Sequence, residues 1–381
     1  MVKNPFWFFL GGGGNLELSN SYFEDALSNK FNYNKKYSNW YIGLHNSNIN
    51  TYTDSNGDTN FFCDTYLKKG FRILDCMELS LWNEYPDNKV LDLVKTNRCM
   101  DNRFCPNCKK VDISRFICNF INKYKTIQEE YVPYMLTLTV PNCSANELDS
   151  TLKKLTSCFR KLYYYLEKMN LYPFCIRGGV RVLEITYNKN TNMYHPHYHC
   201  LVLFRNADIY TYSCFLNPIH KHLYSKKIND YNYISDYCSY IIKIWSLIWQ
   251  GKRLSKYNID FYQFKPGQSE CFDIQWLQVD LRPLDDRGVL EIFKYTFKDS
   301  DVLNYDVFKT LYFSLMHKRL RQGFGVLYDL KCEDFTEEEI EELNLEFEEA
   351  PYELIIFQLQ ELLQTYPDYK KYSRMNSDKY I

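Results

Sequence analysis

Long hydrophobic runs are absent from this sequence. No stretch of its 381 residues approaches the roughly 18 consecutive apolar residues that a membrane-spanning helix needs. The opening segment, MVKNPFWFFLGGGG, has one lysine and too short an apolar run for a secretory signal. We therefore expect a soluble, cytoplasmic protein without a membrane partner.

The missing secretion signal also decides how the cysteines are interpreted. The chain contains 14 Cys, spread over its whole length. Outside an oxidising compartment, most of them are expected to be reduced thiols that pack as small apolar side chains. Only a tight cluster of cysteines would then carry functional meaning.

A large net charge is absent as well, but the near-neutral total hides an asymmetry. The formal net charge is −1, and residues 333–353 contain 11 acidic side chains and no Lys or Arg. Residues 1–332 contain 42 basic and 33 acidic side chains. This positive main body suits a protein that follows a phosphate backbone, although an ordinary solvated surface with an acidic tail fits the same numbers.

The hydrophobic pattern predicts an α+β fold in four parts. Residues 1–60 show no sustained periodicity and are expected to be poorly ordered, and residues 61–120 carry the clustered cysteines. Residues 121–325 are expected to form the main domain, and residues 326–381 an acidic helical tail.

Within the main domain, the pattern predicts a central antiparallel sheet flanked by helices. Strands are expected over 134–140, 179–187, 197–204 and 272–281, and the polar loop between the second and third strands indicates a hairpin. Helices are expected over 145–170, 233–250, 288–300, 304–322 and 335–364.

Three of the seven histidines lie close together in the segment His195–Pro196–His197–Tyr198–His199. Because side chains alternate along a strand, His197 and His199 share one face. Glu184 lies centrally in the opposite strand of the hairpin and could add a carboxylate oxygen to the two imidazole nitrogens. This mixed ligand set suits Mg²⁺ or Mn²⁺ and leaves coordination positions for substrate oxygens.

Two plainer interpretations of the same hairpin stay open. The histidines could be incidental surface residues. Glu184 could face solvent or pair with Arg181 instead of binding a metal.

A second candidate site lies in the predicted helix 288–300. Helical spacing places Glu291, Tyr295 and Lys298 on one face. A phenol is a poor nucleophile at neutral pH, but a neighbouring Lys and a metal-bound phosphate favour its phenolate form. Taken alone, Tyr at helical spacing is more often a packing residue.

The cysteine cluster combines a CxxC pair, Cys105 and Cys108, with Cys99 and Cys76 upstream. Four thiolates suit a closed, tetrahedral structural zinc site. Cys63 could replace Cys76 as the fourth ligand, and reduced thiols without a metal are the alternative. Basic side chains near the cluster could touch a DNA backbone: Arg98, Arg103, Lys109 and Lys110.

The combination resembles the rolling-circle replication initiators of small bacterial plasmids, in the single-tyrosine branch of the HUH endonucleases. Their strand motif resembles YMLTLTVPN (134–142), their histidine motif HPHYHCLVLF (195–204) and their tyrosine motif EIFKYTFKDSD (291–301). A similar cysteine pattern precedes these motifs, and a segment resembling HKRLRQGFG (317–325) follows them. The resemblance covers roughly residues 76–325, and the motif order makes it more specific than any single motif.

The resemblance implies a role for each candidate. Tyr295 would attack a DNA phosphate at the origin, leaving a free 3′-hydroxyl and a 5′-phosphotyrosyl link. Glu291 would direct a water molecule during termination, and Lys298 would position the phosphate. The metal ligands would be Glu184, His197 and His199, with His195 as a positioning residue. The expected partners are single-stranded or hairpin origin DNA, and the helicase and DNA polymerase of a bacterial host.

Three other functions fit parts of the sequence. A histidine-triad nucleotide hydrolase would use the alternating histidines but neither Tyr295 nor a zinc site. A non-cutting origin-binding protein would keep the zinc site and the basic body. A relaxase or transposase of the same superfamily would perform the same chemistry, but a single Tyr with Glu four residues before it favours replication.

Overall fold

The computed structural model of the chain describes two compact units. Unit 1 comprises Met1–Cys118 and Glu333–Ile381, and unit 2 comprises Asn119–Cys332. The described residues are 15–18, 33–47, 51–53, 59–61, 63–77, 79–168, 176–206, 236–255, 258–259, 279–284, 292, 302, 304–330, 355–358, 368 and 370–374. Among them, no helix has both the length and the apolar character needed to cross a membrane.

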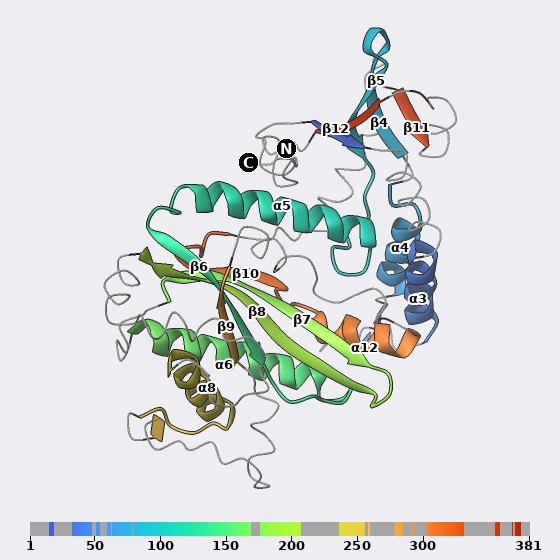
Figure 1. The fold of residues 1–381 in the computed structure, drawn as a ribbon. Coiled ribbons are helices and arrows are strands. Elements are labelled where there is room, and N and C mark those ends of the chain that lie inside the picture. Colours follow the sequence, from blue (N-terminus) through green and yellow to red (C-terminus); the bar gives the residue numbers. More distant parts are fainter. Residues whose placement is uncertain are drawn as a thin grey trace. The chain divides into compact units, whose positions relative to one another are not determined.

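Unit 1 contains a sheet built from both ends of the chain (Figure 1). Its strand order is β1 (Asn15–Leu18), β12 (Lys370–Arg374), β5 (Val90–Thr96), β4 (Leu79–Tyr85) and β11 (Ile355–Gln358). The pair β12–β5 is parallel, and the other pairs are antiparallel. Strands β4 and β5 form a hairpin around the short 3-10 turn Pro86–Asn88.

The remaining elements of unit 1 are two packed helices, a small hairpin and the start of a long helix. Helix α3 (Lys35–Asn46) packs against α4 (Cys63–Leu74), and β2 (Thr51–Thr53) pairs with β3 (Thr59–Phe61). Helix α5 (Pro106–Lys125) begins in unit 1 and ends in unit 2.

Helix α3 contradicts the expectation that residues 1–60 lack regular structure. Its buried side chains include Tyr37, Tyr41 and Leu44, which recur at four- and three-residue spacing. This is the apolar stripe of an ordinary amphipathic helix. Polar Asn, Ser and Lys residues around the stripe concealed it, and tyrosine is a weak marker of burial because its hydroxyl is polar.

Unit 2 is an antiparallel sheet with helices packed on it, as predicted. The strand order is β10 (Arg321–Gly325), β7 (Gly178–Asn188), β8 (Met193–Arg205), β6 (Tyr131–Thr139) and β9 (Val279–Pro283). Strand β8, which carries the histidines, is the middle strand. The predicted hairpin is the pair β7–β8, in which Glu184 lies opposite His197.

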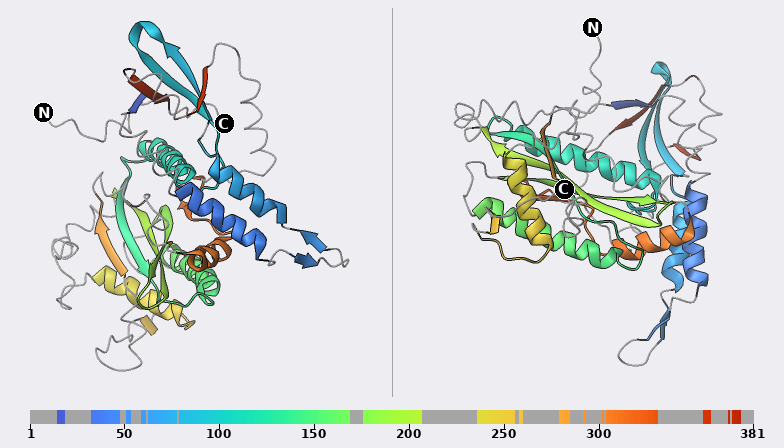
Figure 2. Two further views of the ribbon diagram at one scale, coloured as in Figure 1. Left: turned by 90° about the vertical axis from the view of Figure 1, so that its right-hand side faces the viewer. Right: turned by 60° about the horizontal axis from the view of Figure 1, so that its bottom comes forward.

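Helix α6 (Leu148–Lys168) follows one face of this sheet (Figures 1 and 2). Phe159 of α6 packs edge-on against Tyr198 of β8 and Phe324 of β10. Helices α8 (Asp236–Trp249) and α12 (Tyr305–Leu315) pack against α6. Strand alternation directs His197 and His199 to the face of the sheet opposite to Tyr198.

Two predicted helices differ from the structure. The helix expected over 304–322 ends at Leu315, and Arg321–Gly325 form β10 along β7. His317, with φ 56, turns the backbone out of the helical path. Gly323 in β10 allows the turn that follows the strand to approach closely, since a Cβ at this position would lie 1.8 Å from the Leu327 carbonyl oxygen.

The helix predicted over the acidic segment, residues 335–364, is the second that differs from the structure. Within the expected helix 335–364, Ile355–Gln358 is a strand, β11, that pairs with β4. The apolar sequence IIFQ suits a strand, and the acidic pattern before it does not extend into it. Residues 331–354 and 359–364 lie outside the described part of the chain.

Candidate metal sites

The first candidate site consists of Glu184 on β7 and His197 and His199 on β8. Glu184 Oε2 lies 3.3 Å from His197 Nε2 and 2.9 Å from His199 Nε2. The two Nε2 atoms lie 3.1 Å apart. The carboxylate oxygen and the two Nε2 atoms therefore converge on one position between the three side chains.

These separations fit a divalent cation. An octahedral ion about 2.0–2.1 Å from each ligand places neighbouring ligand atoms about 3.0 Å apart. Two imidazole nitrogens and one carboxylate oxygen could hold such an ion and leave several coordination positions open. His197 is buried, and the other two residues are half-buried, so the site is shielded without being closed.

Charge at the site also favours cation binding. Burial would raise the pKa of Glu184, but hydrogen bonds and charge from His197 and His199 outweigh it and lower that pKa to about 2. The carboxylate is therefore ionised at neutral pH and able to act as a ligand.

The opposite nitrogens of the histidine rings also have partners. His197 Nδ1 lies 3.1 Å from the His195 carbonyl oxygen. His199 Nδ1 lies 3.3 Å from Thr137 Oγ1, and His195 Nδ1 lies 2.6 Å from Asn142 Oδ1. Thr137 and Asn142 had no role in the sequence-based prediction, although both belong to the motif YMLTLTVPN.

Arg181 is not the partner of Glu184, which removes one of the alternatives. Its buried side chain points to the other face of the sheet and donates hydrogen bonds to Tyr198 Oη and Gln322 Oε1. The guanidinium also stacks over the Phe159 and Tyr198 rings. Glu184 and Arg181 are three residues apart on a strand, so they face opposite sides.

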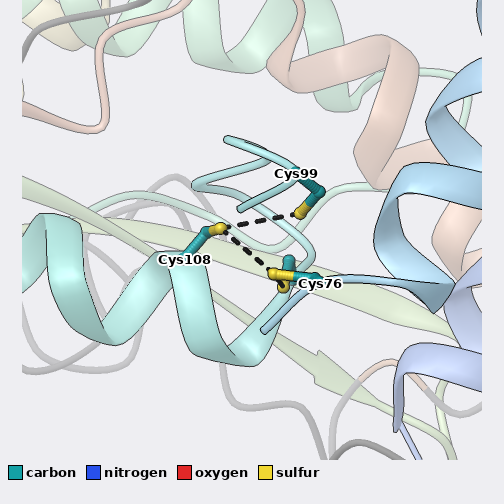
Figure 3. A group of neighbouring side chains, drawn as sticks. Cys76, Cys99 and Cys108 are labelled. Carbon is teal, nitrogen blue, oxygen red and sulfur yellow. Dashed lines mark hydrogen bonds between the residues drawn. The ribbon is translucent and has the colours of Figure 1, made fainter. Parts of the chain in front are cut away.

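The second candidate site is a cluster of four buried sulfurs (Figure 3). The Sγ–Sγ distances are 3.6 Å for Cys76–Cys108, 3.5 Å for Cys99–Cys108 and 3.5 Å for Cys105–Cys76. A disulfide needs about 2.05 Å, so the thiols are free. Tetrahedral zinc about 2.3 Å from each sulfur places the sulfurs about 3.8 Å apart, and the cluster could hold such an ion.

Local turns bring the four cysteines together. Cys76 follows α4, and Met77, with φ 62, donates a hydrogen bond from its amide to Asn97 O at 2.9 Å. Asp101 Oδ1 accepts hydrogen bonds from the amides of Arg103 and Phe104 at 3.1 and 2.9 Å, directly before Cys105. Cys76 is the fourth member of the cluster.

Without a cation, the buried cluster disfavours four thiolates. Burial raises the pKa of Cys99 and of Cys105, whereas hydrogen bonds from Cys105, Cys76 and Cys99 lower the pKa of Cys108. Cys108 lies in the first turn of α5, where the helix dipole also favours a thiolate. A bound cation would compensate the charge of the remaining thiolates.

The tyrosine site predicted from the sequence is not described by the structure. Glu291, Tyr295 and Lys298 all lie outside the described residues. Of the predicted helix 288–300, only Ile292 is described.

The fold and the first site together define an α+β protein with a two-histidine, one-carboxylate site on the middle of an antiparallel sheet. Residues 90–217 match the family described as "Replication protein". This segment includes Glu184, His197, His199 and three of the four clustered cysteines, but not Tyr295.

Several curated proteins named "Protein rep" are also similar to the chain. The one from Staphylococcus aureus is 39% identical over 112 residues, which are 29% of this chain and 47% of that protein. The one from Bacillus sp is 27% identical over 250 residues, or 62% and 69% of the two chains. The one from Bacillus amyloliquefaciens is 28% identical over 250 residues, or 62% of each.

The chain thus covers about half of the staphylococcal relative and about two thirds of the Bacillus relatives. No solved structure matches it. The chain is therefore similar to replication proteins over part of its length.

Proposed function

We propose that the protein initiates rolling-circle replication of a plasmid by nicking one strand at the origin and later rejoining it. The observation that carries this proposal is the convergence of Glu184 Oε2, His197 Nε2 and His199 Nε2 to within 3.3 Å of one another. Similarity to replication proteins over residues 90–217 supports the same conclusion.

The three ligands prepare one phosphate for attack. A bound Mg²⁺ or Mn²⁺ would polarise the scissile phosphate and offset the charge that develops on its oxygens. Glu184 supplies the negative charge that retains the cation, and the two neutral imidazoles leave its remaining charge available to the phosphate. The strands β7 and β8 hold these side chains in a fixed geometry before DNA arrives.

Tyr295 is the proposed nucleophile. Its phenolate oxygen forms a bond to phosphorus while the bond from phosphorus to the 3′-oxygen breaks, and the leaving 3′-oxygen takes up a proton. The products are a 5′-phosphotyrosyl link and a free 3′-hydroxyl that primes synthesis by the host polymerase, while the host helicase unwinds the duplex. Lys298 would position the phosphate, and Glu291 would direct a water molecule in the terminating cleavage before the strand is rejoined.

The four-cysteine cluster is proposed to bind structural zinc. Cys76 follows α4, Cys99 follows β5, and Cys105 and Cys108 lie at the start of α5, so the ion would join these three segments. Such a site contributes directly to folding.

The test is a covalent trapping experiment. Purified protein is incubated with Mn²⁺ and single-stranded oligonucleotides that tile the replicon's origin, and products are separated on a denaturing gel. We expect a metal-dependent adduct whose modified peptide contains Tyr295. Tyr295→Phe should abolish the adduct while origin binding persists, whereas Tyr164→Phe, at an exposed position on α6, should leave it unchanged.

Other outcomes would replace the proposal. An adduct that persists in Tyr295→Phe would overturn the assignment of the nucleophile, and an adduct on a histidine would favour a histidine nucleophile instead. Binding without an adduct across all oligonucleotides would indicate a non-cutting origin-binding protein.

A further inference from the structure

We propose that the motif YMLTLTVPN positions the metal site: Thr137 and Asn142 orient the histidine rings so that their Nε2 atoms face Glu184. This inference rests on the proposed metal site and adds a role for a motif that the chemistry above does not use. Neither residue touches the position of the cation, so both are positioning residues.

The first contact joins β6 to β8. Thr137 lies directly opposite His199 in the strand register, and its Oγ1 lies 3.3 Å from His199 Nδ1. A threonine hydroxyl can accept a hydrogen bond from Nδ1–H. This places the proton of the neutral ring on Nδ1 and leaves the Nε2 lone pair, 2.9 Å from Glu184 Oε2, free for a cation.

The second contact begins just beyond the end of β6. Asn142 Oδ1 lies 2.6 Å from His195 Nδ1. The adjacent backbone is held by two hydrogen bonds, from Cys143 N to Tyr194 O at 2.9 Å and from Tyr194 N to Cys143 O at 2.8 Å. Asn142 is therefore fixed beside the start of the histidine segment.

His195, held by Asn142, in turn orients the ring of His197, which is the first proposed metal ligand. Its carbonyl oxygen lies 3.1 Å from His197 Nδ1 and can accept the Nδ1 proton. Because a carbonyl oxygen cannot donate, the proton of a neutral His197 ring is held on Nδ1, and Nε2 is directed to Glu184. Asn142 holds the His195 ring, and with it the backbone that makes this contact.

The two faces of β6 explain why apolar and polar residues alternate in the motif YMLTLTVPN. Leu136 and Leu138 are buried and alternate with Thr137, so they face the opposite side of the sheet. Thr137 faces the histidines, and Pro141 ends the strand before Asn142. One short segment thus contributes packing on one face and hydrogen bonds to the histidines on the other.

Positioning of this kind matters because the two Nε2 atoms lie 3.3 and 2.9 Å from Glu184 Oε2, close enough to donate a hydrogen bond to it when they carry a proton. A cation needs the lone pair of each Nε2 atom instead. A ring that rotates or moves its proton to Nε2 would no longer present that lone pair to the cation. Hydrogen bonds to the outer nitrogens of metal-binding histidines typically affect metal affinity by about 10–100-fold.

The test compares Mn²⁺ affinity, measured by calorimetry without DNA, in matched variants of the full chain. Thr137→Val keeps the shape of the side chain and removes the hydroxyl, and we expect about a 10–100-fold loss of affinity. Thr137→Ser restores a hydroxyl and should recover most of the affinity. Thr186→Val makes the same change on the same sheet face of β7, opposite His195, and should bind Mn²⁺ as the wild type does.

A second readout separates positioning from general loss of structure. In metal-free protein labelled with ¹⁵N-histidine, Thr137→Val should shift the ring signals of His199 toward the Nε2–H tautomer. Asn142→Ala, at an exposed position beyond the strand, should weaken Mn²⁺ binding without lowering the melting temperature.

The result that overturns the inference is wild-type Mn²⁺ affinity in both Thr137→Val and Asn142→Ala. A loss in Thr137→Val that serine does not recover would also overturn it, because packing would then be the cause. Either result leaves the trapping experiment unaffected, since wild-type protein can form its adduct whether or not these two residues position the rings. An absence of Mn²⁺ binding by the wild type would overturn the metal site and this inference together.

Discussion

Glu184 and His197 are direct register partners across β7 and β8, and their side chains meet on the same face of the sheet. His199, two residues farther along β8, reaches the same carboxylate oxygen. The candidate site therefore depends on the register of one hairpin. A shift by one residue would place Glu184 on the opposite face from both histidines.

Replacing the carboxylate should remove metal binding. Glu184→Gln keeps the size of the side chain but removes the charge and one ligand oxygen. We expect Mn²⁺ affinity to fall by more than about 100-fold, beyond the effect typical of residues that only orient ligands. Calorimetric titration measures the affinity, and the trapping gel should show the adduct disappearing with it.

The matched control is Glu130→Gln, since Glu130 is an exposed carboxylate paired with Arg205. It should retain wild-type affinity. Tight Mn²⁺ binding by Glu184→Gln would show that the cation sits elsewhere.

Removing one clustered cysteine should release one zinc ion. Cys108→Ser replaces the thiol whose hydrogen bonds link the cluster, and we expect native mass spectrometry to show the loss of one zinc equivalent with a lower melting temperature. Cys158→Ala, at a buried thiol outside the cluster, should keep the zinc. Equal zinc content in both variants would contradict the site.

The ion pairs of Asp149 should make a small, pH-dependent contribution to stability. Hydrogen bonds from Lys153 and Lys318 lower the pKa of Asp149, so its contribution is present above the ordinary aspartate pKa and is lost as pH falls through the lowered value. The side chain is 44% exposed, which limits the effect to less than about 1 kcal/mol.

Asp149→Asn should therefore be slightly less stable than the wild type from pH 8 to 5, and the difference should shrink below about pH 4. Urea unfolding at several pH values measures it. Asp368→Asn, at an exposed position outside the helices and strands, serves as the control. A difference that grows on acidification would have the wrong sign for this explanation.

Trp245 should contribute to stability through one hydrogen bond and through its buried packing. Its buried indole Nε1 donates to the carbonyl oxygen of Thr139 at 2.8 Å, which joins α8 to the end of β6. Trp245→Phe leaves that carbonyl without this donor and opens space, which should cost about 2–4 kcal/mol. Trp249→Phe, at a half-buried position on the same helix, should cost less in the same urea titration.

Much of unit 2 could be predicted because the relevant signals are local. The alternation around His197 and the polar loop before it define a hairpin, and the Leu stripe of residues 145–170 defines α6. The meeting of Glu184 with His197 follows once the hairpin register is set. The cysteine spacing likewise identified the cluster, to which the turn after α4 adds Cys76.

The parts that were missed depend on contacts between distant segments. Thr137 reaches His199 only because β6 pairs with β8, 62 residues away, and no local pattern reveals strand order. The first two residues of strand β10 were predicted as the end of a helix, because the strand gains its conformation from pairing with β7. In the same way, the short strand β11 depends on β4.

The sheet of unit 1 has a consequence for synthesis of the protein. Strand β12 lies between β1 and β5, so Lys370–Arg374 is hydrogen-bonded to strands that are made much earlier. Unit 2 is one continuous segment between them and can fold while the ribosome is still translating. Unit 1 must wait for Lys370–Arg374, so a truncated product would contain a complete unit 2 beside an open sheet edge exposed to aggregation.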